Sequence, residues 1–133
     1  MILVDSSVWI DFFRGHSTAQ SDWLDRNLDV EELAIGDLIL AEVLRGLQDD
    51  RSFYEVQTML WQLTQVEIGG FDIAVSAAKN YRKLRNIGVT VRGTVDVLIA
   101  TRCLHNGLPL LHSDRDFDPF AQHLALRVVD CAA

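Results

Sequence analysis

The sequence predicts an α/β fold of three layers, α/β/α, around a central, mostly parallel sheet of four to five strands. Short apolar runs alternate along the chain with longer segments whose apolar residues recur at helical spacing. The apolar runs end at Asp, Gly or Ser, residues that turn a chain or begin a helix. The chain of 133 residues can bury one core, so we expect a single domain spanning residues 1–133.

The N-terminal third predicts one strand and two helices. The run Met1–Val4 ends at Asp5, as a fully buried parallel strand would. Ser6 and Ser7 can cap the next helix, and Gly15 can end it. The apolar faces of this helix come from Val8, Trp9, Phe12 and Phe13. A second helix is expected to begin at Ser17 or Ser21, with apolar residues at Trp23, Leu24 and Leu28.

The middle third predicts two strands and two helices. Residues 33–35 read as a strand, and Gly36-Asp37 as the turn and cap of a helix that reaches Leu47. Ser52 can cap a further amphipathic helix, and residues 65–68 form the next expected strand.

The last third predicts two long helices and two strands. Helical spacing extends over residues 71–86, and Thr94 can cap a helix that stops at Asn106-Gly107. The last strands are expected at residues 108–112 and 126–129, with a turn at residues 113–118 between them.

Charge sets limits on the partners of this chain. The net charge is −7, which argues against broad, sequence-blind coating of nucleic acid. Five of the twelve basic residues nevertheless fall in fourteen positions without an acid between them: Lys79, Arg82, Lys83, Arg85 and Arg92. This segment is either a solvated helix face or a local patch that faces phosphate.

The sequence predicts a cytoplasmic protein. No apolar run of eighteen residues could span a bilayer, and residues 1–5 lack the basic start of a secretory signal. Cys103 and Cys131 lie far apart with no CxxC pair, so both read as free thiols of a reducing compartment.

Acidic residues lie at the predicted strand ends. They are Asp5 after the first strand, Glu42 in the helix after the second, Asp96 on a first helical turn, and Asp114 and Asp116 after residues 108–112. Singly, each could be a helix cap or a favourable partner of a helix dipole. Because ligands bind beyond the carboxyl ends of parallel strands, the acids are expected to share one site.

Such a cluster favours a divalent cation. Two carboxylates about 4 Å apart repel by roughly 4 kcal/mol at an effective dielectric constant near 20. Oxygen ligands without histidine or thiolate suit Mg²⁺, with Mn²⁺ as a possible substitute. Because Mg²⁺ keeps waters and shares phosphate oxygens, the pattern points to phosphoryl chemistry.

Four sequence blocks resemble the signature blocks of PIN domains and, more narrowly, of the VapC toxins of VapBC toxin–antitoxin pairs. The blocks are Val4-Asp5-Ser6-Ser7-Val8-Trp9-Ile10, the Glu42 helix, Thr94-Val95-Asp96-Val97-Leu98-Ile99-Ala100 and Leu111-His112-Ser113-Asp114-Arg115-Asp116-Phe117. The resemblance covers nearly the whole chain in the right order. By position, Asp5, Glu42, Asp96 and Asp114 match the acidic tetrad, Asp116 an additional acid, and Ser7 a hydroxyl residue near the metal.

The resemblance implies a Mg²⁺-dependent endoribonuclease that hydrolyses RNA to a 5′-phosphate and a 3′-hydroxyl. Asp5 and Asp96 would be the principal metal ligands. Glu42 and Asp114 would bind a second ion or orient the nucleophile, with assistance from Asp116. Ser7, Arg85 and Arg92 are candidates for binding the RNA substrate, the two arginines by steering it.

The resemblance also implies a homodimer and a cognate VapB-type antitoxin that occludes the acidic site. Large aromatic residues of the predicted helices could line a groove for such a partner or pack in the core: Trp9, Phe12, Phe13, Phe53 and Trp61.

Three other functions remain open at this point. A DNA nuclease would use the same metal chemistry. No feature of the sequence indicates recognition of the 2′-hydroxyl group that distinguishes RNA from DNA. A binding module would use the acids as caps alone. A receiver domain would need an acid pair after the first strand and a lysine after a late one, where this chain has Ser6-Ser7 and Asp114.

Overall fold

The computed structural model describes residues 1–132 and has a four-stranded, wholly parallel sheet. The strands are β1 (Ile2–Val4), β2 (Leu33–Gly36), β3 (Thr64–Val66) and β4 (Leu110–Leu111). Their order is β3-β2-β1-β4, with Leu3 paired to Ala34 on one side and to Leu110 on the other. The predicted α/β class and mostly parallel sheet are confirmed. All four strands end at the same edge of the sheet.

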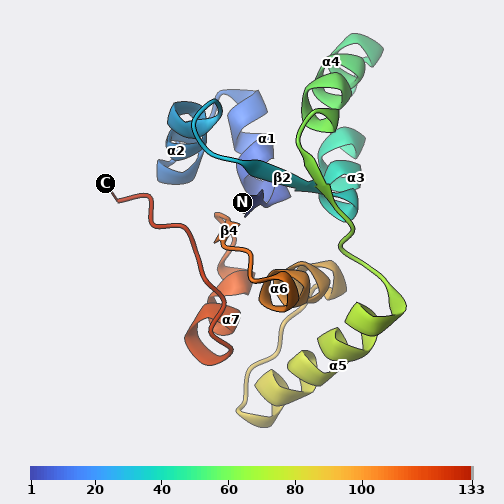
Figure 1. The fold of residues 1–133 in the computed structure, drawn as a ribbon, viewed down its shortest axis with the longest axis vertical. Coiled ribbons are helices and arrows are strands. Elements are labelled where there is room, and N and C mark those ends of the chain that lie inside the picture. Colours follow the sequence, from blue (N-terminus) through green and yellow to red (C-terminus); the bar gives the residue numbers. More distant parts are fainter. Residues whose placement is uncertain (133) are drawn as a thin grey trace.

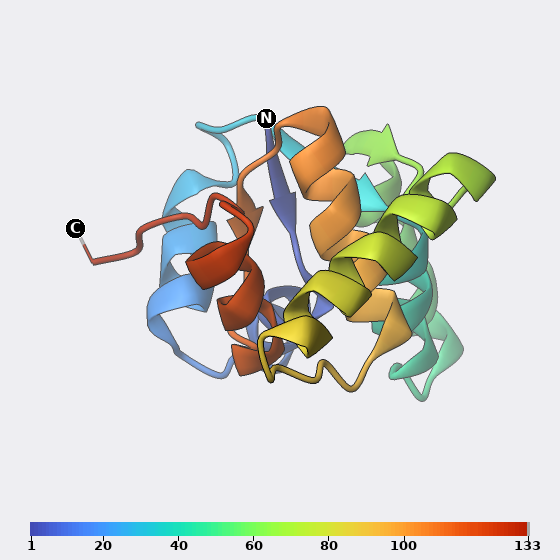
Figure 2. The same cartoon turned by 90° about the horizontal axis from the view of Figure 1, so that it is seen from below.

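Helices cover both faces of the sheet (Figure 1). They are α1 (Ser6–Arg14), α2 (Ala19–Asn27), α3 (Asp37–Arg45), α4 (Asp50–Trp61), α5 (Phe71–Asn86), α6 (Thr94–Asn106), α7 (Asp118–His123) and the 3₁₀ turn η1 (Arg115–Phe117). Helices α1 and α3 lie on one side and α6 on the other, and Figure 2 shows α5 lying alongside α6. Within residues 1–132, no helix combines the length and the apolar character that crossing a membrane needs.

Several helices begin at other caps than those predicted, and two of these caps are acidic side chains. Asp5 caps α1 by accepting from the Ser7 backbone, and Asp49 caps α4 by accepting from Ser52. Thr18 caps α2, and Ser21 completes a capping box from inside the helix. At α6 the cap position is Gly93, so Thr94 is the first helical residue and not the cap.

The C-terminal segment also differs from the prediction. Residues 126–129 form a single parallel bridge, Leu110 to Val128, and not a full strand. Residues 118–123 form α7, for which no helix was predicted, because six residues are too few to display a helical period.

Aromatic residues of α1 belong to the core. Trp9 is fully buried and stacks on Phe13 with ring centroids 5.7 Å apart. In contrast, Phe53 and Trp61 of α4 are exposed, Trp61 to 58%. Core packing therefore accounts for Trp9, whereas the α4 aromatics are open to solvent.

The junction after β2 is tied to the segment after β3. The Asp37 Oδ1 atom accepts from the Ile68 backbone at 2.8 Å, and a Cβ at Gly36 would lie 2.5 Å from the Ile68 side chain. Arg102 of α6 donates to the carbonyls of Ile68 and Gly69. These contacts fix the start of α3 and the C-terminal half of α6 relative to the segment that follows β3.

Candidate metal centre

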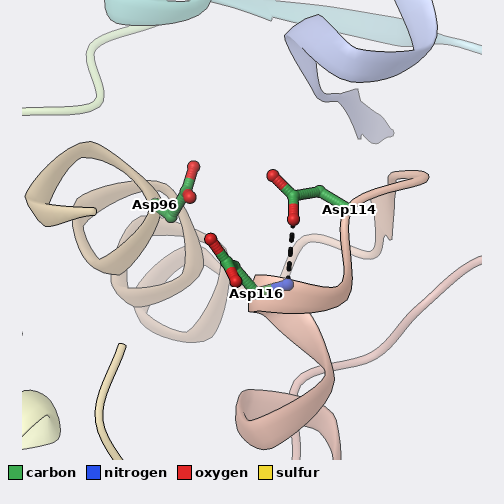
Figure 3. A group of neighbouring side chains, drawn as sticks. All are labelled: Asp96, Asp114 and Asp116. Atoms are coloured by element: carbon green, nitrogen blue, oxygen red, sulfur yellow. Dashed lines mark hydrogen bonds between the residues drawn. The ribbon is translucent and has the colours of Figure 1, made fainter. Parts of the chain in front are cut away.

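Three aspartates from two segments meet beyond the sheet edge. Asp96 lies on the first turn of α6, Asp114 follows β4, and Asp116 lies in η1. Each offers a carboxylate oxygen, and these oxygens all lie within 4.8 Å of one another. Figure 3 shows the three side chains pointing into a shared space. This spacing allows one cation to contact all three.

Asp5 and Glu42 contribute to the same electrostatic field. Partial burial raises the pKa of Asp96 to about 7, and the negative charges of Asp5, Asp114, Glu42 and Asp116 add to that rise, in this order. Burial likewise raises the pKa of Glu42, against the hydrogen bond from Ser6, and the charges of Asp5 and Asp114 add to the rise. The structure therefore groups Asp96, Asp114 and Asp116 within 4.8 Å, and Asp5 and Glu42 lie near enough for their charges to raise the pKa of Asp96.

Asp5 is the most deeply buried of the five. Its side chain is 2% exposed, and burial is the main cause that raises its pKa. The Oδ2 atom accepts from the Ser7 amide at 3.1 Å and from the Ser7 hydroxyl at 2.6 Å. The Oδ1 atom is buried and has no hydrogen-bond partner. Because a buried carboxylate oxygen without a partner is costly, a cation at Oδ1 would remove a penalty present in its absence.

In Asp114 and Glu42, as in Asp5, one carboxylate oxygen accepts a hydrogen bond from the protein. Asp114 Oδ1 accepts from the Asp116 amide at 2.9 Å (Figure 3), and Glu42 Oε1 accepts from the Ser6 hydroxyl at 3.1 Å. In Asp5, Glu42 and Asp114, one oxygen is therefore held by a donor of the protein. The other oxygen is left for a ligand.

Ser7 joins the ends of two strands. Its hydroxyl donates to Asp5 and accepts from the Ser113 amide at 3.2 Å, which lies 106 residues further along the chain. Ser7 also lines an open hollow of about 480 Å³ beside Asp114 and Asp116. It was predicted to contact substrate, but its hydroxyl is engaged with protein groups, so its position favours holding the site together.

Arg85 lies near the end of α5, and Arg92 lies in the loop that leads from α5 to α6. The Arg85 guanidinium lies over the Tyr81 ring, 5.7 Å from the centroid. Arg92 precedes Gly93 and lines a hollow of about 510 Å³ between α5 and α6. Both side chains are exposed, and the one salt bridge found in residues 1–132 joins Arg51 to Glu55 instead. The structure does not bring either arginine into the acidic cluster.

Three residues near the cluster escaped the sequence analysis: Ser6, Gly93 and His112. Ser6 was considered only as a cap, although it holds Glu42 from 36 residues away. A Cβ at Gly93 would lie 3.1 Å from Asp96 Oδ2, so glycine leaves room for that carboxylate. His112 is buried, which lowers the pKa of its ring. A glycine three residues before an acid was the one sequence signal that pointed to any of them.

The donor set fits a hard divalent cation. Asp96, Asp114 and Asp116 offer converging oxygens, and Asp5 offers a buried oxygen without a partner. Histidine and thiolate ligands, which would favour zinc, are absent from the cluster found in residues 1–132. Carboxylate oxygens in an open site suit Mg²⁺ or Mn²⁺.

Comparisons with known proteins identify the family of this chain. The PIN domain model matches residues 2–122. The chain is 32% identical to ribonuclease VapC11 of Mycobacterium tuberculosis over 124 residues, which cover 92% of each protein.

Solved structures share the fold at lower identity. DNA-bound VapBC from Salmonella typhimurium aligns with a TM-score of 0.74 at 18% identity, covering 99% of this chain and 100% of that one. A toxin–antitoxin complex from Klebsiella pneumoniae aligns with a TM-score of 0.71 at 18% identity, covering 98% of each chain. The family match and the VapC11 relative carry the assignment: the chain belongs to the PIN-domain family and, within it, to the VapC ribonucleases.

Proposed function

We propose that this protein hydrolyses phosphodiester bonds in RNA with Mg²⁺ held by Asp5, Asp96 and Asp114, and that it acts as the toxin of a toxin–antitoxin pair. The observation that carries the proposal is the convergence of Asp96, Asp114 and Asp116 within 4.8 Å, beside a buried Asp5 oxygen without a partner. Mn²⁺ would substitute for Mg²⁺, because it accepts the same oxygen ligands.

The chain's own residues have separate tasks in this reaction. The cation would be held by Asp5 Oδ1 and by free oxygens of Asp96 and Asp114. Asp116 offers a further carboxylate oxygen in the same cluster. The chemistry that the cation supplies when bound is Lewis acidity toward water and the scissile phosphate. Glu42, held through Oε1 by Ser6, presents its other oxygen to orient the attacking water and take its proton. In-line attack would leave a 5′-phosphate and a 3′-hydroxyl.

The basic segment would guide the RNA. Arg85 and Arg92 are exposed and make no ion pair among the contacts described for residues 1–132. Arg92 lies two residues before Thr94, the first residue of α6, and Asp96 lies on the first turn of that helix. Cations in such a position can bind backbone phosphates that flank the scissile bond.

A direct test compares RNA and DNA strands of matched sequence. The protein should cut single-stranded RNA in Mg²⁺ or Mn²⁺, leave 5′-phosphate ends, and stop in EDTA. Asp5→Asn should abolish cleavage while its circular dichroism spectrum stays that of the wild type. Equal cleavage of DNA would contradict the RNA assignment, and a fully active Asp5→Asn protein would remove the metal site from the mechanism.

We further propose a VapB-type antitoxin partner and a homodimer. The fold is shared with a chain of a solved toxin–antitoxin complex. The exposed aromatics of α4, Phe53, Tyr54 and Trp61, form an apolar surface that a partner helix can cover. Mixing the protein with the product of its neighbouring gene should suppress cleavage, whereas undiminished activity of the mixture would contradict the pairing.

A further inference from the structure

The turn that carries Asp114 and Asp116 rests on His112, a histidine that the proposed mechanism does not use. His112 directly follows β4 and is 7% exposed. Its Nδ1 atom accepts a hydrogen bond from the Asp114 amide at 3.2 Å. The ring also packs against Phe117 of η1, with ring centroids 5.0 Å apart and planes at 51°. One buried side chain therefore contacts both the start and the end of the turn.

Two consecutive hydrogen bonds connect this ring to the carboxylates. The Asp114 amide donates to His112, and the Asp116 amide donates to Asp114 Oδ1 at 2.9 Å. The first bond fixes the backbone of Asp114, and the second fixes the direction of its carboxylate. Because Asp96 approaches from α6, a shift of this turn would change the 4.8 Å grouping of the three oxygens.

We propose that His112 is a positioning residue that sets the geometry of Asp114 and Asp116 through its Nδ1 acceptor. The inference rests on the proposed function, since the geometry in question is that of the metal site. An Nδ1 atom accepts a hydrogen bond only without a proton of its own, so this bond requires the tautomer that carries its proton on Nε2. His112 touches neither cation nor substrate in this scheme.

Three substitutions separate the acceptor from the ring. His112→Asn places a carbonyl oxygen where Nδ1 lies and removes the ring. His112→Gln moves that oxygen one bond further, to the position of Nε2. His112→Phe keeps a ring against Phe117 and removes the acceptor. The Asn and Gln variants both lose the ring packing, so a difference between them reports the acceptor position.

The measured quantity is the affinity for Mn²⁺ alone, from titration calorimetry of the full chain, with Asp96→Asn as the reference without a functional site. Loss of a residue that orients metal ligands typically costs about 10-fold to 100-fold in metal affinity. We expect about 10-fold weaker Mn²⁺ binding in His112→Phe and His112→Gln, and binding within about 3-fold of wild type in His112→Asn.

Equal Mn²⁺ affinity in the Asn and Gln variants would overturn the proposal, even if His112→Phe fails to fold. Nitrogen-15 NMR of the wild-type histidines gives an independent reading: His112 should carry its proton on Nε2, and a protonated Nδ1 would overturn the proposal without reference to the metal. Failure of the wild type to bind Mn²⁺ in an Asp96-dependent way would instead contradict the proposed function, and the NMR result would still decide the role of His112.

Discussion

The acidic cluster and the basic segment at residues 79–92 carry opposite charges and are built in opposite ways. In the cluster, oxygens of Asp5, Glu42 and Asp114 are held by hydrogen bonds from Ser7, Ser6 and the Asp116 amide. In the basic segment, Arg85 and Arg92 are exposed, and Arg85 is placed only by packing over Tyr81. The difference indicates that the acidic side chains are held in place before any ligand binds, while the arginine side chains are free to adjust.

This comparison predicts large effects in the cluster and small ones in the basic segment. Asp96→Asn should reduce RNA cleavage about 1,000-fold, on the order of 4 kcal/mol of transition-state stabilisation. Cleavage of one labelled RNA in Mg²⁺ measures the effect. Asp118→Asn is the matched control, because Asp118 lies in α7 close to the site but outside the cluster. Similar losses of cleavage in both variants would mean that any acidic residue near the site has this effect, whether or not it belongs to the cluster.

Gly93→Ala should reduce cleavage less than loss of a ligand, by about 10-fold. The added Cβ would lie 3.1 Å from Asp96 Oδ2, which is tighter than an ordinary contact, so the carboxylate must move by a few tenths of an ångström. Gly69→Ala is the control, because a Cβ there meets nothing within 4 Å. The ratio of the two cleavage rates measures the effect. A ratio near one would show that the Asp96 carboxylate accommodates the added methyl group without loss of activity.

Arg85→Gln and Arg92→Gln should each weaken RNA binding about 3-fold and lower the slope of log affinity against log salt by about one. Catalysis at saturating RNA should change little, because neither arginine reaches the cluster. Arg51→Gln is the control, since Arg51 is paired with Glu55 on α4, across the sheet from α5. A large fall in the saturated rate for Arg92→Gln would place that residue in the metal site after all.

Without a cation, the cluster should destabilise the fold as pH rises. Because the pKa of Asp96 is raised to about 7 from an ordinary 3.8, the folded protein binds more protons than the unfolded chain between these values. The free energy of unfolding should therefore fall from about pH 4 to about pH 7 and level off above.

Thermal melting in EDTA at pH 5 and pH 8 measures this decline. Asp96 is half-buried and water screens part of the effect, so the difference in Tm should be roughly 2–5 °C, smaller in Asp96→Asn, and reversed by Mg²⁺. A Tm that rises with pH in EDTA would contradict the raised pKa.

The sequence was sufficient to predict the longer strands and helices and to place Asp96, Asp114 and Asp116 near one another, because the spacing of apolar residues and the acids at strand ends are local features. Residues 71–86 form the predicted helix, and Gly15 and Gly107 end α1 and α6 in the left-handed conformation. Short elements were missed, such as α7 with six residues and the single bridge at Val128.

The hydrogen bonds that hold the acids were not predicted, because they join residues that are far apart in the sequence. Ser6 holds Glu42 from 36 residues away, and Ser7 bonds a backbone amide 106 residues away. No local period or spacing encodes such pairs. Asp5 was weighed as either a helix cap or a site residue, and its two oxygens provide for both: Oδ2 caps α1, and Oδ1 has no partner.

The most direct test of the account is anomalous diffraction from crystals of this protein soaked in MnCl₂. The account predicts a manganese peak between Asp96, Asp114 and Asp116, with carboxylate oxygens and Asp5 Oδ1 at about 2–2.5 Å or joined through one water. Absence of a peak there, or a peak only at Asp22 and Asp25, two exposed acids of α2 outside the cluster, would contradict this prediction.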